Sequence, residues 1–218
     1  MMLRFQLFGF PVRVDPWFWL VSALLGGAAN KLGQPGGGTE VLLWVGMVFV
    51  SILWHELGHA FAMRQFGSRA EIFLYAGGGL AAPSPGRFTR KEDFMVSAAG
   101  PAAGFLLGLA VWLYQRGWPT ESSLVAFCVT QMLWINVIWS LVNCLPALPL
   151  DGGHMLRAIL GGKEKVVAIC GIVCCAGMIG YALIELKSVF VAIMFGLFLY
   201  QNIQLYRNPW QQPPHIPG

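Results

Sequence analysis

The chain has 218 residues, of which 56% are hydrophobic and only 11% are charged, and its net charge is +4. Soluble domains carry about 25% charged residues, so this composition excludes an ordinary soluble protein and predicts a polytopic membrane protein. The small and dispersed positive charge also argues against nucleic acid as a partner. Since no polar stretch reaches the roughly 50 residues of a separate soluble domain, we expect one membrane domain over residues 1–218.

The amino end is expected to form a short hairpin followed by the first membrane span. Residues 3–16 alternate loosely around Gly9 and Pro11, which suits a hairpin at the membrane surface. Three aromatic residues, 17–19, then begin a short span at residues 17–30. Further apolar runs bring the expected number of transmembrane helices to about six, the others being 41–64, 94–114, 124–144, 166–184 and 189–206.

A polar, glycine-rich insert at residues 67–93 separates the second and third expected spans. Within it, residues 69–75 are strand-like and Gly77–Gly79 predict a turn. In the third span, glycines at four-residue spacing (Gly100, Gly104 and Gly108) predict close helix packing. We therefore expect an all-α polytopic membrane protein with a small β-hairpin-like insert and a polar tail at 207–218.

The basic residues predict the orientation in the membrane. Eleven of the 14 lysines and arginines fall at the amino end, in residues 64–93 and 146–165, and in the tail. Only Lys31, Arg116 and Lys187 fall in the intervening loops. By the positive-inside rule, both termini are expected in the cytoplasm. The expected location is the cell membrane of a bacterium or archaeon.

His55, Glu56 and His59 form the most informative motif. Imidazoles four residues apart lie on one face of a helix, so both can reach one metal ion with Glu56 beside it. Burying these side chains in an apolar span costs several kcal/mol unless a partner satisfies them, and a bound metal would be such a partner. The alternative is a pair of packed intramembrane histidines bonded to neighbouring groups.

Asp151 is the strongest candidate for a third ligand. The expected topology returns the loop after the fourth span to the side where the histidines lie, and a catalytic zinc takes three protein ligands and keeps one open position. Alternatively, Asp151 caps a helix that begins before Leu156. His154 could join the site or lie apart as a loop histidine, and Asn143 could merely cap the fourth span.

Two segments together resemble the site-2 protease family of intramembrane zinc metalloproteases. They are His55–His59 inside a span and Asn143–Gly153, which ends in Pro-Leu-Asp-Gly-Gly after another span. A third landmark is Ala-Gly-Pro at residues 99–101. The chain departs from the usual family pattern at Gly104 and Cys144, where many members have Asn and Pro.

The resemblance implies a set of roles. His55, His59 and Asp151 would bind one zinc ion per chain, Glu56 would be the catalytic base, and Asn143 would support the oxyanion or the substrate. The implied activity is hydrolysis of peptide bonds in or near transmembrane segments of other membrane proteins. A membrane metal transporter and an inactive scaffold are the alternatives. A transporter gives no reason for Glu56, and an inactive member usually lacks a ligand or the glutamate, whereas all four residues are present here.

A substrate helix must unwind before hydrolysis, because its carbonyls are otherwise engaged in helix hydrogen bonds. The strand-like residues 69–75 follow the metal motif closely, so we expect their edge, with Ile72 and Leu74, to pair with the unwound substrate by strand addition. The alternative is that residues 69–82 only close the helix bundle against lipid.

Overall fold

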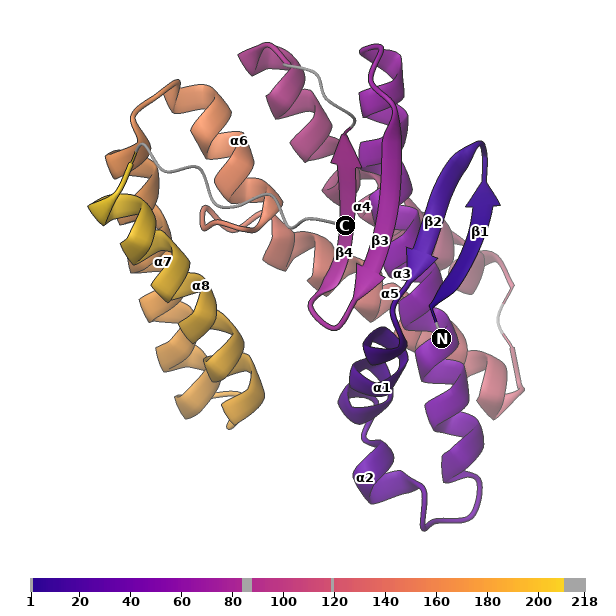
Figure 1. Cartoon of the computed structure of the whole chain (residues 1–218). Coiled ribbons are helices and arrows are strands. Elements are labelled where there is room, and N and C mark those ends of the chain that lie inside the picture. Colours follow the sequence, from indigo (N-terminus) through magenta and orange to yellow (C-terminus); the bar gives the residue numbers. More distant parts are fainter. Residues whose placement is uncertain (1, 84–87, 119, 210–218) are drawn as a thin grey trace. The chain divides into compact units, whose positions relative to one another are not determined.

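The computed structural model describes residues 2–83, 88–118 and 120–209. Among these residues, five helices are long and apolar enough to cross a membrane, and Figure 1 shows them as α3 (Gly37–Gln65), α4 (Arg90–Gly117), α5 (Ser123–Asn143), α7 (Glu164–Ile184) and α8 (Val189–Arg207). Shorter helices are α1 (Pro16–Leu25), α2 (Ala28–Lys31) and α6 (Asp151–Leu160). The expected polytopic helical fold is confirmed. Most of the tail expected at 207–218 lies outside the described residues.

Two short helices take the place of the first expected span. α1 has 10 residues and α2 has 4, whereas a helix needs about 20 residues to cross the hydrocarbon core. The Asp15 side chain caps α1 by accepting from the Trp17 N–H, and Gly27, with φ +81°, separates the two helices. The indole Nε1 of Trp44 in α3 donates to the Ser22 carbonyl at 3.0 Å. About six spans were expected. The described residues form five helices of spanning length, and the first expected span is instead a short apolar helix packed on α3.

The chain forms two compact units. The first contains residues 1–88 and 99–141, and the second contains residues 89–98 and 142–218. α4 contributes to both units, since its first turns belong to the second and the remainder to the first. That the two units act as one domain remains a prediction.

The first unit contains a four-stranded sheet in the order β1 (Leu3–Leu7), β2 (Phe10–Val14), β3 (Ala70–Tyr75) and β4 (Gly78–Pro83). The outer pairs are antiparallel, whereas β2 and β3 run parallel, with Val12 opposite Ile72 and Val14 opposite Leu74. These four side chains are at most 1% exposed. The sequence suggested strands in both regions, and the structure joins them in one sheet beside α3 (Figure 1).

β3 is an inner strand, which makes the expected docking edge at Ile72 and Leu74 wrong. Ile72 is paired with Val12 of β2 on one side and with Ala81 of β4 on the other. Both backbone edges of β3 are therefore occupied, and the outer strands of the sheet are β1 and β4. The expected turn at Gly77–Gly79 is also shorter, because β4 already begins at Gly78.

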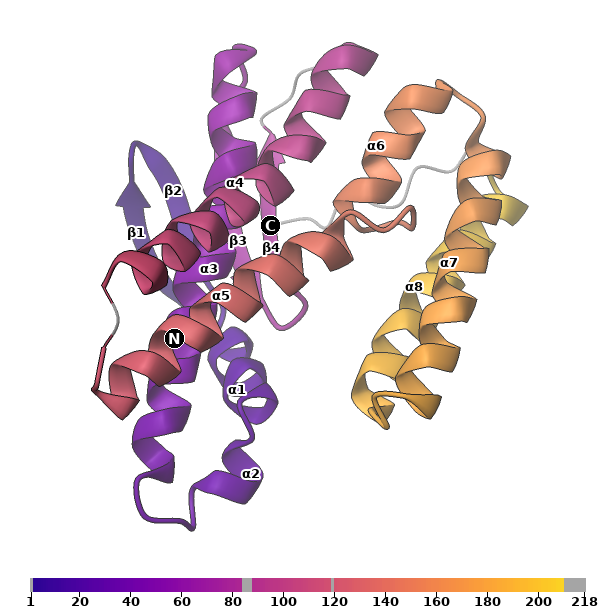
Figure 2. The same cartoon turned by 180° about the vertical axis from the view of Figure 1, so that it is seen from behind.

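α3 packs closely against α4 and α5 within the first unit. A Cβ atom on Gly58 of α3 would lie 2.5 Å from the Ala99 carbonyl oxygen, so only glycine permits this crossing. Asn136 Nδ2 of α5 donates to Ser51 Oγ of α3 at 2.9 Å, which satisfies two buried polar side chains in an apolar setting. Figure 2 shows α5 crossing α3 on the face turned away from the sheet. The motif helix thus lies between the sheet and α5.

In the second unit, the loop of residues 144–150 packs against α7 and α8. One buried cluster joins the loop to both helices, and its members are Ala147, Leu150, Cys175 and Phe195. α6 follows directly and begins at Asp151. The sequence did not predict this start, because Gly152 and Gly153 favour a loop. A Cβ atom on Gly153 would lie 2.6 Å from the Leu148 nitrogen, so the glycines let the first turn of α6 rest on the loop backbone.

Candidate metal centre

His55 and His59 converge on one face of α3. Their side chains are 2% and 6% exposed, and their Nε2 atoms lie 3.3 Å apart. Two ligands at about 2.05 Å from one zinc ion, with a tetrahedral angle of about 109°, would be about 3.3 Å apart. The observed imidazole pair therefore fits a single tetrahedral metal ion without rearrangement.

Gly100 of α4 faces the two imidazole nitrogens. A Cβ atom at this position would overlap His59 Nε2 and would lie 2.7 Å from His55 Nε2. By contrast, Gly104 packs against Ser140 Oγ and Gly108 against Val137 of α5, as expected for helix packing. Gly100 thus lies at the centre, although the four-residue spacing of the glycines predicted only a packing role. Its position in the Ala-Gly-Pro landmark was the signal in the sequence that could have indicated a role at the site.

Glu56 lies beneath β4. Its side chain is 5% exposed, and a Cβ atom on Gly79 of β4 would overlap the Glu56 carboxyl group. The pKa of Tyr75, at the end of β3, is raised first by burial and second by the negative charge of Glu56. The backbone of β4 therefore approaches the carboxylate closely, and Gly79 makes this approach possible. The sequence showed only a glycine run here.

The remaining candidates belong to the second unit. Asp151 is half-buried and is the first residue of α6, where the helix dipole favours a carboxylate. The alternative role as a helix cap does not hold, since Leu150 occupies the N-cap position. Asn143 is the last residue of α5, and His154 is exposed on α6.

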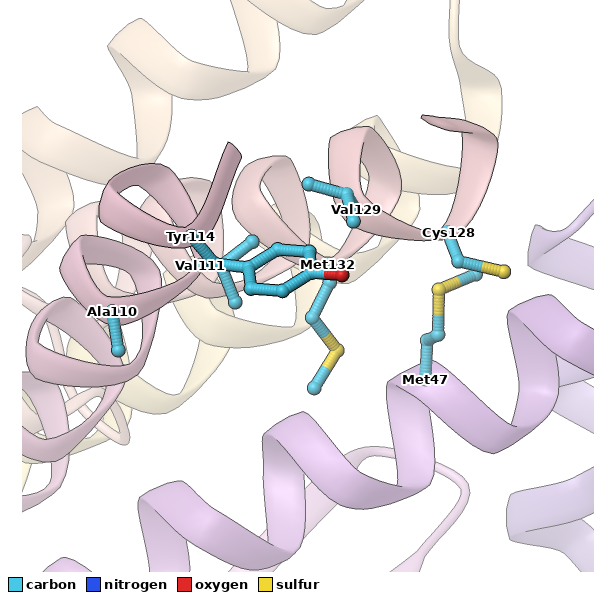
Figure 3. A pocket seen from close by; sticks show the side chains of 7 residues that line it. All are labelled: Met47, Ala110, Val111, Tyr114, Cys128, Val129 and Met132. Carbon is cyan, nitrogen blue, oxygen red and sulfur yellow. The ribbon is translucent and has the colours of Figure 1, made fainter. Parts of the chain in front are cut away.

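A hollow elsewhere in the first unit is lined mainly by apolar side chains and has a single cysteine as a potential metal ligand. It lies between α3, α4 and α5, and Figure 3 shows its lining: Met47, Ala110, Val111, Tyr114, Cys128, Val129 and Met132. Met47 precedes His55 on α3 by two helical turns, about 12 Å along the axis. The lining contains neither an imidazole nor a carboxylate, so the candidate centre is the His55–His59 pair and not this hollow.

A buried His-Glu-His helix in a polytopic helical fold, flanked by a sheet strand that contacts the glutamate, defines a membrane protein with a hydrolase-type metal motif. The chain belongs to the peptidase M50B-like family, whose sequence profile matches residues 38–147. The profile of peptidase family M50 matches residues 115–183. The resemblance to site-2 proteases is confirmed.

Similar proteins come from bacteria and archaea. A Synechocystis protein with the name of a zinc metalloprotease is 31% identical over 219 residues, and a zinc metalloprotease of Methanocaldococcus jannaschii is 25% identical over 206 residues. In both comparisons 90% of this chain is matched, but it spans only 57% of the relative's length. Stage IV sporulation protein FB of Bacillus subtilis is 31% identical over 66% of this chain and 46% of its own length.

The solved structure of a site-2 protease from Methanocaldococcus jannaschii has the same fold. It superimposes with a TM-score of 0.67 at 22% identity, and the alignment covers 100% of both chains. At this identity the likeness concerns the fold alone.

Proposed function

We propose that this protein is an intramembrane zinc metalloprotease that hydrolyses peptide bonds in or near transmembrane segments of other membrane proteins. The observation that carries the proposal is the 3.3 Å separation of the His55 and His59 Nε2 atoms, with Glu56 buried beside them, in a helix of membrane-spanning length. A transporter would use the histidines but would give Glu56 no task. The family and the names of the relatives support the same activity.

Asp151 is the proposed third ligand. Its carboxylate, together with the two imidazoles, completes a donor set that leaves one tetrahedral position open, as catalytic zinc sites do. The position of Asp151 at the start of α6 supports this role, because the helix end favours the charged carboxylate that a metal needs. We propose one zinc ion per chain.

Glu56 is the proposed catalytic base. Zinc, when bound, would polarise the scissile carbonyl and increase the acidity of a water molecule. Glu56 accepts a proton from the attacking water and later donates it to the leaving amine nitrogen. Asn143 can contribute an amide donor for the substrate carbonyl or the developing oxyanion, a role that rests on the family resemblance.

The substrate would reach Glu56 along β4. β4 is an outer strand, and its backbone at Gly79 touches the Glu56 carboxyl group. An unwound substrate segment that pairs with the outer edge of β4 gains the backbone hydrogen bonds it lost on unwinding. The same pairing brings its carbonyls next to the catalytic base. This replaces the docking edge on β3, which the structure excludes.

The proposed function is tested by Glu56→Gln. The amide keeps the shape of the side chain but cannot accept the proton, so cleavage of transmembrane reporter substrates should fall by at least about 100-fold. Zinc content and thermal stability should match the wild type. Exposed Glu121, outside the helices, provides a control as Glu121→Gln. Full cleavage activity in the Glu56→Gln variant would contradict the mechanism.

A further inference from the structure

Asn202 of α8 contacts the loop that precedes Asp151. Its side chain is fully buried, with 0% exposure, in a helix of membrane-spanning length. Its Nδ2 donates to the carbonyl of Leu148 at 2.7 Å and to that of Phe198, in its own helix, at 2.8 Å. Its Oδ1 accepts from the Leu148 N–H at 3.4 Å. One amide therefore binds both backbone groups of a single loop residue.

α7 provides the space for this amide. A Cβ atom on Gly171 would overlap Asn202 Oδ1 and would lie 2.5 Å from its Cγ. The amide cannot move aside easily, because its hydrogen bonds to Leu148 and Phe198 fix its orientation. Glycine at position 171 is thus a condition for the contact with the loop.

The contact extends from Leu148 to the first turn of α6. The Leu148 side chain packs on the cluster of Val167, Ala168 and Leu205, so this residue is held through both its side chain and its backbone. The Leu148 nitrogen is also the atom that a Cβ on Gly153 would approach to 2.6 Å. Asp151 lies between these two positions, in the turn that rests on Leu148.

We propose that Asn202 is a positioning residue for Asp151: it fixes the backbone of Leu148, and through it the first turn of α6, so that the carboxylate is held ready for the metal. The inference rests on the proposed role of Asp151 as a zinc ligand. Groups hydrogen-bonded directly to a metal ligand typically contribute 10- to 100-fold to metal affinity, and Asn202 acts one step further back, through Leu148, so its contribution is expected near the lower end, about tenfold.

The test uses the full chain with Asn202→Leu and, separately, Gly171→Ala, which keeps the amide but displaces it. The matched controls are Gln201→Leu on the exposed side of α8 and Gly177→Ala, where a Cβ atom meets open space. In the metal-free protein, hydrogen–deuterium exchange of residues 144–150 should become faster in both test variants. In chelator competition their zinc affinity should fall by about tenfold, and excess zinc should restore cleavage. The controls should behave as the wild type.

Unchanged zinc affinity in a folded Asn202→Leu or Gly171→Ala variant would overturn the inference, even if stability were lower. The contact would then stabilise the fold without positioning Asp151. If Asn202→Leu fails to fold, Gly171→Ala decides. A wild-type protein that binds no zinc would instead contradict the proposed function, and the exchange of residues 144–150 would then decide whether Asn202 holds the loop.

Discussion

At the scale of single residues, the centre depends on what lies opposite each polar side chain. His55 and His59 face Gly100, and Glu56 faces Gly79. The residue opposite each polar side chain is therefore a glycine, which has no side chain. Glycine at these two positions lets α4 and β4 approach the nitrogens and the carboxylate without steric overlap. The motif alone does not define the centre, because a side chain at either glycine would occupy the space next to the imidazoles or the carboxylate.

The ligand set gives the first prediction at this scale. His55→Ala combined with His59→Ala should abolish zinc binding, and Asp151→Ala should lower zinc affinity by at least about 10- to 100-fold, the cost of losing even an outer partner. Metal analysis of purified protein measures both effects. His154→Ala, which changes an exposed residue of the same helix as Asp151, is the control. Stoichiometric zinc in the double histidine variant would mean that the metal is bound elsewhere.

A second prediction concerns the space in front of the imidazoles. Gly100→Ala adds a methyl group that would overlap His59 Nε2, so zinc affinity and cleavage should both fall by about tenfold or more. Gly46→Ala in α3 adds the same methyl group in open space and should change neither quantity. Chelator competition and reporter cleavage provide the two measurements. Normal zinc affinity in Gly100→Ala would show that the metal does not occupy this face.

At the scale of elements, the proposed docking on β4 predicts opposite results for cross-linking of a substrate to the two outer strands of the sheet. β4 passes over Glu56, whereas β1 lies at the other end of the strand order. Leu80 of β4 and Leu3 of β1 are similarly exposed, at 43% and 49%. They therefore provide a matched pair of positions from which to probe where a substrate strand lies.

We expect Leu80→Cys, in a background without the native cysteines and with Glu56→Gln to retain the substrate, to form a disulfide with a cysteine placed near the scissile bond. Leu3→Cys should not. Non-reducing electrophoresis measures the cross-linked fraction. Cross-linking from position 3 but not from position 80 would move the docking edge to β1.

The elements also show why sequence reasoning succeeded and where it failed. The five long apolar helices, the motif helix among them, follow from local pattern, because burial in a membrane demands long uninterrupted helices. The parallel pairing of β2 with β3 could not be predicted, since it joins segments far apart along the chain. A helix before Leu156 was one alternative, but its start at Asp151 was not predicted, because Gly152 and Gly153 pack closely on the loop, a tertiary effect that overrides their low helix propensity.

At the scale of the whole molecule, contacts in the first unit show which segments share an end of α3. Arg64 Nη1, at the end of α3, donates to the Phe8 carbonyl in the first hairpin, and Lys31 forms an ion pair with Glu40 near the start of α3. The first hairpin, which precedes α1, therefore lies at the carboxyl-terminal end of α3. α1 and α2 together lead the chain to the opposite end. The distribution of basic residues predicts that two further helix pairs, α4 with α5 and α7 with α8, each cross the membrane twice, which would return the chain to its starting side.

We accordingly predict that both termini are cytoplasmic. An alkaline phosphatase fused after residue 209 should be inactive, because the enzyme matures only outside the cytoplasm, whereas a fusion after Arg116 should be active. Phosphatase activity normalised to expression is the measurement. An active fusion after residue 209 would mean an odd number of crossings or the inverse orientation.

The parallel pairing of β2 with β3 has a consequence for biosynthesis. Residues 15–69, which include all of α3, separate the two strands. A translating ribosome therefore releases the first hairpin well before its partner strand exists, and the sheet is completed only after α3 has been made. Closing so distant a contact is slow compared with helix formation. β4 is synthesised last of the four strands, so Gly79 reaches Glu56 only after the motif helix has formed. During that interval the nascent chain contains the motif helix but lacks its finished sheet, so the carboxylate proposed as the catalytic base acquires its neighbouring strand only at a late stage of folding.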